Sequence, residues 1–310
     1  MDILRALRNR LAVPREAPLP SVPLRGVRQR WLLLYNCQVL GLANSLNLLS
    51  DEIEVEARDP HAFRREADAI GARLSSFDRV LAAPQLARDA PIDLDRHGTL
   101  WQLPTLSFSA YHPDICYLQH EGKALKGPLG DYHSLIAWAA FRSGLDVAAT
   151  LALYREDVYA QLGYFDRWDA ARDAMLGTFA QHGFDLAPHF VQWTRGEAFM
   201  YSINHPRIAC VRDVARCVLA RAGIQAVYED ALPQDNLANG PIFPVYPEIG
   251  ARLGVQGSLL FKLGGAYRFL RLADYVEASF RLYRDHDGIT IRNEHAALQD
   301  AAMTLIGRHA

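Results

Sequence analysis

Short apolar runs alternate with amphipathic stretches through the first third of the chain. The run Trp31–Tyr35 is short, continuous and apolar, which is typical of a buried strand. It stops at Asn36–Gln38, and from Val39 to Leu49 the apolar positions recur at helical spacing. The pattern predicts a strand that leads at once into a helix. Cys37 would then lie at the carboxyl end of a strand, where open α/β folds build their sites.

The same alternation continues to about residue 106. The glutamates that alternate in the second strand indicate an edge position, and strands that alternate with helices predict a mainly parallel sheet. The expected elements are strands over Ile53–Ala57, Arg79–Ala83 and Thr99–Leu103, with a helix over Pro60–Leu74.

Helical patterns dominate after Pro113. We expect helices over Ser134–Phe141, Leu145–Leu162, Trp168–His182, Leu186–Trp193, Pro206–Gly223 and Phe269–Arg284, with an extended loop over Pro233–Pro247. The segment after the last helix is expected to be peripheral. The fold class predicted is α/β: a small, mainly parallel sheet over about 30–110, and a helix-rich half over about 130–310 packed on it, together one catalytic domain over 30–310.

Residues 1–29 read differently from the rest. They hold arginines and four prolines but no apolar segment of signal-peptide length. We interpret them as a loosely docked basic arm, with a weak membrane-surface contact as the alternative. No run of about 18 apolar residues occurs, so no transmembrane segment is expected.

Composition narrows the function classes. Half of the 310 residues are hydrophobic and the net charge is −2, which gives no electrostatic argument for nucleic acid. The four cysteines form no CxxC pair, so a metal site is not expected, and a reduced, cytoplasmic chain fits best.

Cys37 is the first candidate for chemistry. The unpaired amides at the start of a helix favour a thiolate, which is the nucleophilic form of cysteine. The alternative is a small buried hydrophobe that fills the corner between strand and helix. The polar neighbours Asn36 and Gln38 leave both interpretations open.

Two further segments carry polar residues near predicted element ends. Tyr111, His112 and Asp114 follow the fourth strand, so they are expected on the same rim as Cys37, although Asp114 can equally be a turn cap. Gly130–Ser134 opens a helix, with Asp131 as its N-cap and Tyr132 and His133 in its first turn. The helix dipole would keep that histidine neutral and able to accept a proton.

Two more segments complete the candidates. In Asn204–Arg207, Pro206 is expected at the first helical position, which leaves His205 fixed just before a helix and able to meet a cysteine there. A plain helix cap is the alternative for Asn204 or His205. Lys123 and Lys126 lie in a loop suited to phosphate contacts, or are simply solvated. No Walker A, GxGxxG, HExxH or GxSxG motif occurs.

Four of these segments, in order, resemble the WcbI family of capsular-polysaccharide biosynthesis proteins: 35–38, 108–114, 130–132 and 204–206. The family's usual opening is Gly-Asn-Cys-Gln, and Tyr35 replaces the glycine here. The resemblance implies binding of coenzyme A and acetylation of capsule sugars. Cys37 and Gln38 match the cysteine motif, and Asn204 and His205 match the histidine motif.

The leading hypothesis is an acyltransferase that moves acetyl from acetyl-CoA to a sugar hydroxyl. Cys37 would take the acyl group, His205 would act as base, and Asp131 or Asp114 would orient an imidazole. Gln38 and the helix amides after Cys37 would hold the oxyanion. A variant has the histidine activate the sugar directly, with Cys37 lining the pocket.

Substrate or cofactor contacts are expected from Asn36, Tyr111, His112, Asp114, Tyr132, His133, Asn204, Lys123, Lys126 and Arg207. The rival hypotheses are an esterase on the same scaffold and a non-catalytic subunit that binds coenzyme A or a glycan. The expected partners are therefore an acyl-CoA and a saccharide acceptor.

Overall fold

A four-stranded parallel sheet organises the N-terminal half of the computed structural model, which describes residues 28–228 and 230–307. The strand order is β2-β1-β3-β4. The strands are β1 (Gln29–Leu34), β2 (Ile53–Arg58), β3 (Arg79–Ala82) and β4 (Leu100–Gln102). The predicted parallel sheet is confirmed, and so is the edge position of the second strand. Residues 1–27 of the expected arm over 1–29 lie outside the described residues.

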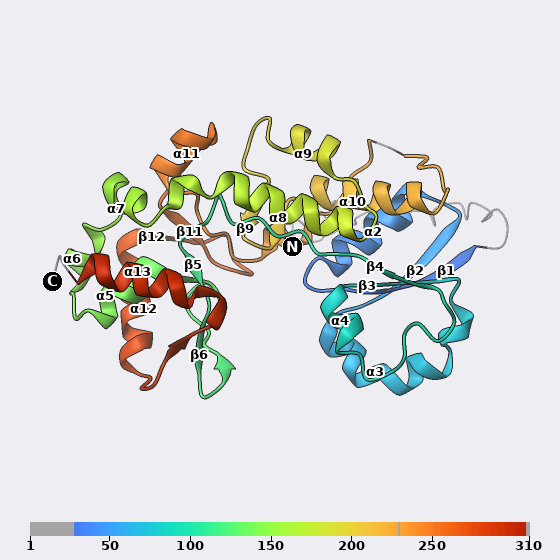
Figure 1. Ribbon diagram of the computed structural model, residues 1–310, viewed down its shortest axis with the longest axis horizontal. Helices are drawn as coiled ribbons and strands as arrows, with labels where there is room; N and C mark the ends of the chain where they lie inside the picture. Colours follow the sequence, from blue (N-terminus) through green and yellow to red (C-terminus); the bar gives the residue numbers. More distant parts are fainter. Residues whose placement is uncertain (1–27, 229, 308–310) are drawn as a thin grey trace, which may run out of the picture.

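Helices cover both faces of this sheet (Figure 1). Trp31 and Leu33 of β1 belong to the main core cluster, whereas Leu32 and Leu34 belong to a second cluster with α3. The alternation of side chains along a strand therefore buries β1 on both sides. The helices of this half are α2 (Val39–Leu49), α3 (Pro60–Ala72) and α4 (Pro84–Arg88), joined by α10 (Ile208–Arg221) from later in the chain.

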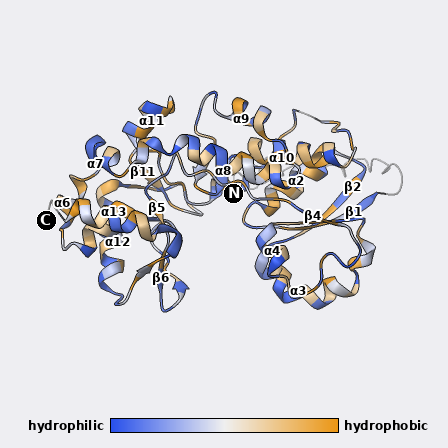
Figure 2. Ribbon diagram, in the orientation of Figure 1, coloured by the Kyte–Doolittle hydropathy of each residue, from blue (hydrophilic) through white to orange (hydrophobic). Residues whose placement is uncertain are grey.

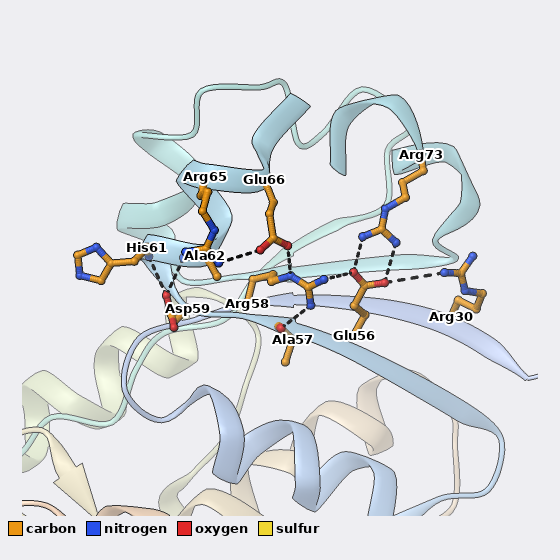
Figure 3. A network of polar contacts seen from close by, with 10 residues as sticks. All are labelled: Arg30, Glu56, Ala57, Arg58, Asp59, His61, Ala62, Arg65, Glu66 and Arg73. Atoms are coloured by element: carbon orange, nitrogen blue, oxygen red, sulfur yellow. Dashed lines mark hydrogen bonds and ion pairs between the residues drawn. The ribbon is translucent and has the colours of Figure 1, made fainter. Parts of the chain in front are cut away.

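The exposed edge of the sheet carries a network of charges (Figure 3). Glu56 of β2 accepts hydrogen bonds from the guanidinium of Arg73 and lies 2.9 Å from Arg58, which also contacts Glu66 at 2.6 Å. The bond from Arg73 is the main cause that lowers the pKa of Glu56. Charged side chains on an edge strand disfavour pairing with another chain.

The C-terminal half is mainly helical, with short strand pairs between the helices. In Figure 1, α8 lies across the middle of the molecule, between the sheet and this half. Most helices alternate hydrophobic and hydrophilic residues (Figure 2), as helices that bury one side do. The helices are α5 (Leu135–Arg142), α6 (Val147–Leu151), α7 (Glu156–Gln161), α8 (Trp168–Gln181), α9 (Ala187–Trp193), α11 (Pro247–Leu253), α12 (Leu272–Arg284) and α13 (Ala296–Ile306).

The short strands of this half were not anticipated from the sequence, since most are two or three residues long. They are β5 (Ile115–Cys116), β6 (Leu118–His120), β7 (Lys123–Ala124), β8 (His133–Ser134), β9 (Met200–Ser202), β10 (His205–Pro206), β11 (Leu260–Lys262), β12 (Phe269–Arg271) and β13 (Thr290–Ile291). The predicted fold class is nevertheless confirmed.

Tertiary contacts change three of the expected helices. The helix expected over Leu145–Leu162 is two helices, because Leu153 and Tyr154 turn into the core and the Tyr154 hydroxyl lies 2.6 Å from that of Ser134. The one expected to begin at Phe269 begins at Leu272, after β12.

The helix expected from Pro206 also starts later. Pro206 pairs with Met200 in a hairpin, and the next amide, that of Arg207, donates to Phe199, so α10 begins only at Ile208. The expectation of a peripheral C-terminal segment is wrong as well. Ala302 and Ile306 of α13 are fully buried, and this helix packs on α5.

Candidate functional site

The strand–helix junction has the form that the sequence pattern predicts. Asn36 turns the chain after β1: its side-chain oxygen accepts from the amide of Gln38 at 3.0 Å, and its carbonyl accepts from Val39 at 3.0 Å. Cys37 is exposed at this turn, just ahead of α2. The strands on either side of β1 are β2 and β3, so the junction lies at the point where strand order reverses, the usual ligand position in open α/β sheets.

The side chain of Gln38 connects this junction to two distant segments. Its amide nitrogen donates to the carbonyls of Leu106 at 2.8 Å and Asn204 at 3.0 Å. Its oxygen accepts from the amide of Leu106 at 3.2 Å, and the residue is only 2 % exposed. Both N–H groups of this amide are therefore used within the protein.

These bonds overturn the part of the oxyanion expectation that rests on Gln38 and on the amide of Val39. The Gln38 side chain has no donor left for a ligand, and the backbone amides of Gln38 and Val39 are bonded to Asn36. Gln38 is a positioning residue in this structure rather than a catalytic one.

The second half of the site is the turn between β9 and β10. Phe108 donates to the carbonyl of Ile203 at 2.8 Å, and Gln38 holds the carbonyl of Asn204, so both turn carbonyls are fixed. The thiol of Cys37 lies 4.0 Å from the same Asn204 carbonyl. His205, the next residue, therefore lies close to the cysteine.

Tyr132 joins the turn from a third segment. Its hydroxyl donates to the side-chain oxygen of Asn204 at 2.5 Å, an oxygen that Ser202 also contacts at 3.3 Å. Its ring meets that of His205 edge to face, with centroids 5.6 Å apart. Cys37, Tyr132, Asn204 and His205 thus gather at one place although they are far apart in sequence.

Packing between α2 and α10 explains why Cys37 lies beside the turn that carries Asn204 and His205. The two helices begin shortly after these residues, and they pack against each other. A side chain at Gly41 of α2 would meet Ile208 of α10 at 3.1 Å, so the glycine allows the close approach.

Burial sets the protonation of the two reactive groups. Cys37 is exposed at the surface of the turn, but the surrounding protein removes solvent from its sulfur. This desolvation is the main cause that raises the pKa of the Cys37 thiol to about 11, and hydrogen bonds from the Cys37 and Gln38 amides act in the opposite direction. The predicted effect of helix amides is present, but it is outweighed. Burial also lowers the pKa of His205 to about 4. At neutral pH the site therefore pairs a protonated thiol with a neutral imidazole.

Neither acid expected to orient the imidazole does so. The Nδ1 atom of His205 is buried and has no hydrogen-bond partner among the described residues. Asp131 forms an exposed ion pair with Lys126 at 2.5 Å. It is also not the N-cap of α5, because Ser134 fills that position and accepts from Ala137. Tyr132 and His133 consequently precede the helix rather than form its first turn.

Asp114 is a core residue. It is fully buried, and its carboxylate accepts from Tyr164 at 2.8 Å, from Tyr246 at 2.5 Å and from the amide of Ile136 at 2.9 Å. Burial raises its pKa to about 6. It caps the segment that starts α5, the alternative that its position in the sequence allowed, and does not reach a ligand in this structure.

Three other expected contacts are also buried in the core. His112 lies between the carbonyls of Met200 at 3.2 Å and Pro244 at 3.4 Å, and burial lowers its pKa to about 4. His133 lies 2.9 Å from the carbonyl of Leu125 and 3.1 Å from the Tyr283 hydroxyl. The third, Tyr111, packs edge to face on Trp168 and Phe199. Their surroundings leave them a structural role here.

The basic candidates differ from one another. Lys123 is exposed in the short strand β7, and Lys126 is exposed beside Asp131. Arg207 bonds to the carbonyl of Ala198 at 2.8 Å and pairs with Glu197 at 2.5 Å, which holds it along its own hairpin. Of these three side chains the two lysines are exposed, and the partner of Lys126, Asp131, directly precedes Tyr132.

Sequence reasoning missed Tyr117. Its ring centroid is 6.1 Å from that of Tyr132, because the residue before it, Cys116, pairs with His133 between β5 and β8. No motif marks this tyrosine, and two-residue strands leave no periodic signal.

The cavities of about 480 Å³ beside Phe141 and about 310 Å³ beside Trp193 are lined by residues other than Cys37, so a pocket at Cys37 stays a prediction. Within residues 28–228 and 230–307, no group of three or more His, Cys, Asp or Glu could hold a metal ion. In the same ranges, no helix is long and apolar enough to cross a membrane.

Comparison with known proteins gives two matches. The family described as polysaccharide biosynthesis enzyme WcbI matches residues 30–227. A solved WcbI structure is similar with a TM-score of 0.63 and 15 % identity, and the match covers 92 % of this chain and 95 % of that one. It is described as a novel polysaccharide biosynthesis enzyme, the native protein without a disulfide bond between coenzyme A and a cysteine. No curated protein matches.

The Gln38 contacts generate a stability prediction. Gln38→Leu keeps the approximate size of the side chain but replaces its carboxamide by an apolar group. The buried carbonyls of Leu106 and Asn204 then have lost their donor. We expect the free energy of unfolding to fall by about 2–4 kcal/mol in urea titrations. Gln85→Leu, at an exposed position, should change it by less than about 0.5 kcal/mol. Equal effects of the two substitutions would contradict the role of Gln38.

Asp114 generates a prediction of pH dependence. Its folded pKa of about 6 exceeds the ordinary aspartate value of 3.8, so the folded state binds the proton more tightly. The stability from this group is complete below pH 4 and is lost as the pH rises through 6, a change of about 3 kcal/mol.

Urea titrations at pH 4 to 7 of the native protein and Asp114→Asn test this sign. The native protein should lose about 2 kcal/mol relative to the variant over that range, most of the full effect. His112 titrates in both proteins, so the difference isolates Asp114. A difference that does not vary with pH would contradict the prediction.

Proposed function

The chain belongs to the WcbI family of polysaccharide biosynthesis enzymes, and on this premise we propose that it transfers an acyl group, acetyl, from coenzyme A to a sugar hydroxyl. The acceptor is a saccharide of a capsule or another surface polysaccharide. The reaction centre is the junction where Cys37 lies 4.0 Å from the carbonyl of Asn204, next to His205. That single arrangement carries the proposal, because it sets a thiol and a neutral imidazole at the carboxyl edge of the sheet.

Cysteine exposure supports coenzyme A as the donor. The similar WcbI structure is described in terms of a disulfide between coenzyme A and a cysteine. Of the four cysteines here, Cys116 and Cys210 are buried, Cys217 is intermediate and Cys37 is exposed. Cys37 is therefore the one we assign to face the thiol end of coenzyme A.

The electrostatics favour direct transfer over an acyl-cysteine intermediate. A thiol with a pKa of about 11 is ionised in only about one molecule in ten thousand at pH 7. Cysteine attacks as the thiolate, and this site leaves the thiol protonated. A hydroxyl needs no prior ionisation: it can pass its proton to the neutral imidazole of His205 while its oxygen bonds the acyl carbon of a thioester.

In this route the proton that leaves the sugar hydroxyl ends on the sulfur of coenzyme A. The sugar oxygen forms a bond to the acyl carbon while its proton moves to His205, and the bond from that carbon to sulfur breaks. The imidazolium then returns the proton to the sulfur, which yields free coenzyme A. Cys37 lines the donor end and Tyr132 holds the turn through Asn204. We further propose that the reaction takes place in the cytoplasm, as the unpaired cysteines suggest.

Two substitutions separate the routes. In direct transfer, His205→Ala loses at least about 100-fold in turnover, because it removes the general base. Cys37→Ser keeps turnover within about tenfold, because serine preserves the wall of the site. Turnover is followed as release of coenzyme A from acetyl-CoA with a saccharide acceptor, and binding is checked by calorimetry with coenzyme A.

Other outcomes would identify other functions. An acetyl adduct on Cys37 by mass spectrometry, together with an inactive Cys37→Ser protein, would contradict direct transfer and support the covalent route. Binding of coenzyme A with no turnover would point to a non-catalytic subunit. Release of acetate to water without an acceptor would identify an esterase.

A further inference from the structure

The chain after residue 227, beyond the match to the family, returns to the neighbourhood of Cys37. The strand β13 pairs antiparallel with β6, with Thr290 opposite Gln119 and Ile291 opposite Leu118. The next amide, that of Arg292, donates to the carbonyl of Tyr117 at 3.0 Å. Residues 290–295 therefore lie against the tyrosine that contacts Tyr132.

A row of rings leads away from the proposed reaction centre. The ring of His205 is 5.6 Å from that of Tyr132, which is 6.1 Å from that of Tyr117, which in turn is 5.6 Å from that of His295. The Cys37 thiol contributes to the raised pKa values of both tyrosines, although burial is the largest cause. The row thus begins beside the thiol and ends at the C-terminal segment.

Two basic side chains lie beside this row, Arg292 at Tyr117 and Lys126 at Asp131, whose charge acts on both tyrosines. The Arg292 guanidinium lies 5.0 Å from the centre of the Tyr117 ring and pairs with Glu294 at 3.0 Å. Lys126 pairs with Asp131 at 2.5 Å. The side chains of Arg292 and Lys126 are 44 % and 66 % exposed, so both ion pairs are weak and can exchange a carboxylate for a phosphate.

His295 adds an unused polar atom to the same end. Its Nε2 is buried without a hydrogen-bond partner among the described residues, and it lies 4.0 Å from a Glu294 oxygen. Displacement of Glu294 from Arg292 by a phosphate would leave the phosphate oxygens near this nitrogen. The row of rings fits the uncharged part of a ligand. The side chains of Arg292, Lys126 and His295 fit an anionic group at one end of it.

We propose that Arg292, with Lys126, binds the diphosphate of an extended ligand whose uncharged arm passes Tyr117 toward Cys37. The inference rests on the proposed function, which sets the reactive end of the donor at Cys37. Coenzyme A has this form, with a thiol, a neutral pantetheine arm and a diphosphate. A planar guanidinium forms paired hydrogen bonds to phosphate oxygens, which a point charge does not. A nucleoside diphosphate sugar carries the same diphosphate and is the second source of this chemistry.

Calorimetric titration of four proteins tests the inference. They are the native chain, Arg292→Gln, Arg292→Lys and a matched control, Arg281→Gln, at an exposed position of α12. The probes are coenzyme A, pantetheine, which lacks every phosphate, and UDP-glucose. Arg292→Gln should weaken coenzyme A at least tenfold, and Arg292→Lys by less. Pantetheine should bind all four equally, and Arg281→Gln should behave as the native chain.

Two further measurements, the salt dependence of the affinity and the KM for acetyl-CoA, would not change if Arg292 had only a structural role. The loss caused by Arg292→Gln should shrink at 0.5 M salt, because the diphosphate contact is electrostatic. The KM for acetyl-CoA should rise while kcat stays near its native value, since Arg292 lies away from the reacting atoms.

The outcomes distinguish this inference from the proposed function. If the native chain binds coenzyme A and Arg292→Gln binds it equally, the inference is wrong and the proposed function stands. If the native chain does not bind coenzyme A, the proposed function fails. A loss of UDP-glucose binding in Arg292→Gln would then assign the diphosphate to the acceptor, and no such loss would overturn the inference too. Arg292→Lys gives the same comparison if Arg292→Gln does not fold.

Discussion

The carboxamide of Gln38 holds the site together. It is buried, and it exchanges three hydrogen bonds with backbone groups of Leu106 and Asn204. These groups belong to the loop after β4 and to the β9–β10 turn, so one side chain fixes both against the junction of β1 and α2. Unpaired carbonyls in a core cost more than a paired bond contributes, which makes this amide hard to replace. The position of Cys37 beside His205 depends on it.

Burial then determines what the assembled groups can do. The surroundings that position Cys37 and His205 also penalise charge, so the thiol keeps its proton and the imidazole stays neutral. An ionised cysteine–histidine pair would need an acid or a polar partner for the histidine, and Nδ1 has none in the described structure. A neutral base beside a neutral thiol is better suited to activate a hydroxyl than to build a nucleophilic cysteine.

The sequence predicted the sheet and the first helix well because their signals are local. The strand at Trp31–Tyr35, the helix at Val39–Leu49 and the edge strand from Ile53 all follow from periodicity, and the structure has their ends within two residues. The order of strands around β1 places Cys37 at the switch point. Proximity of Cys37 and His205 was expected because each precedes a helix. In the structure the Cys37 thiol lies 4.0 Å from the carbonyl of Asn204, the residue before that histidine.

The surroundings of other residues could not be predicted from local sequence patterns, because distant segments form them. Asp114 and His112 look like rim residues, but buried tyrosines and carbonyls from distant segments enclose them. Asp131 has the chemistry of an N-cap, yet Ser134 takes that position once β8 pairs with β5. The approach of residues 290–295 to Tyr117 depends on a two-residue strand, which has no sequence signature. Tertiary pairing decided each of these positions.

The ionisation of Cys37 tests the central claim most directly. Iodoacetamide alkylates thiolate rather than thiol, and peptide mass spectrometry measures its rate at Cys37 separately from the buried cysteines. With a pKa of about 11, the rate should still rise steadily between pH 7 and 9.5, and coenzyme A should protect the thiol. A rate that levels off near pH 7 would mean that Cys37 is already ionised, and the account of a neutral thiol beside a neutral base would be wrong.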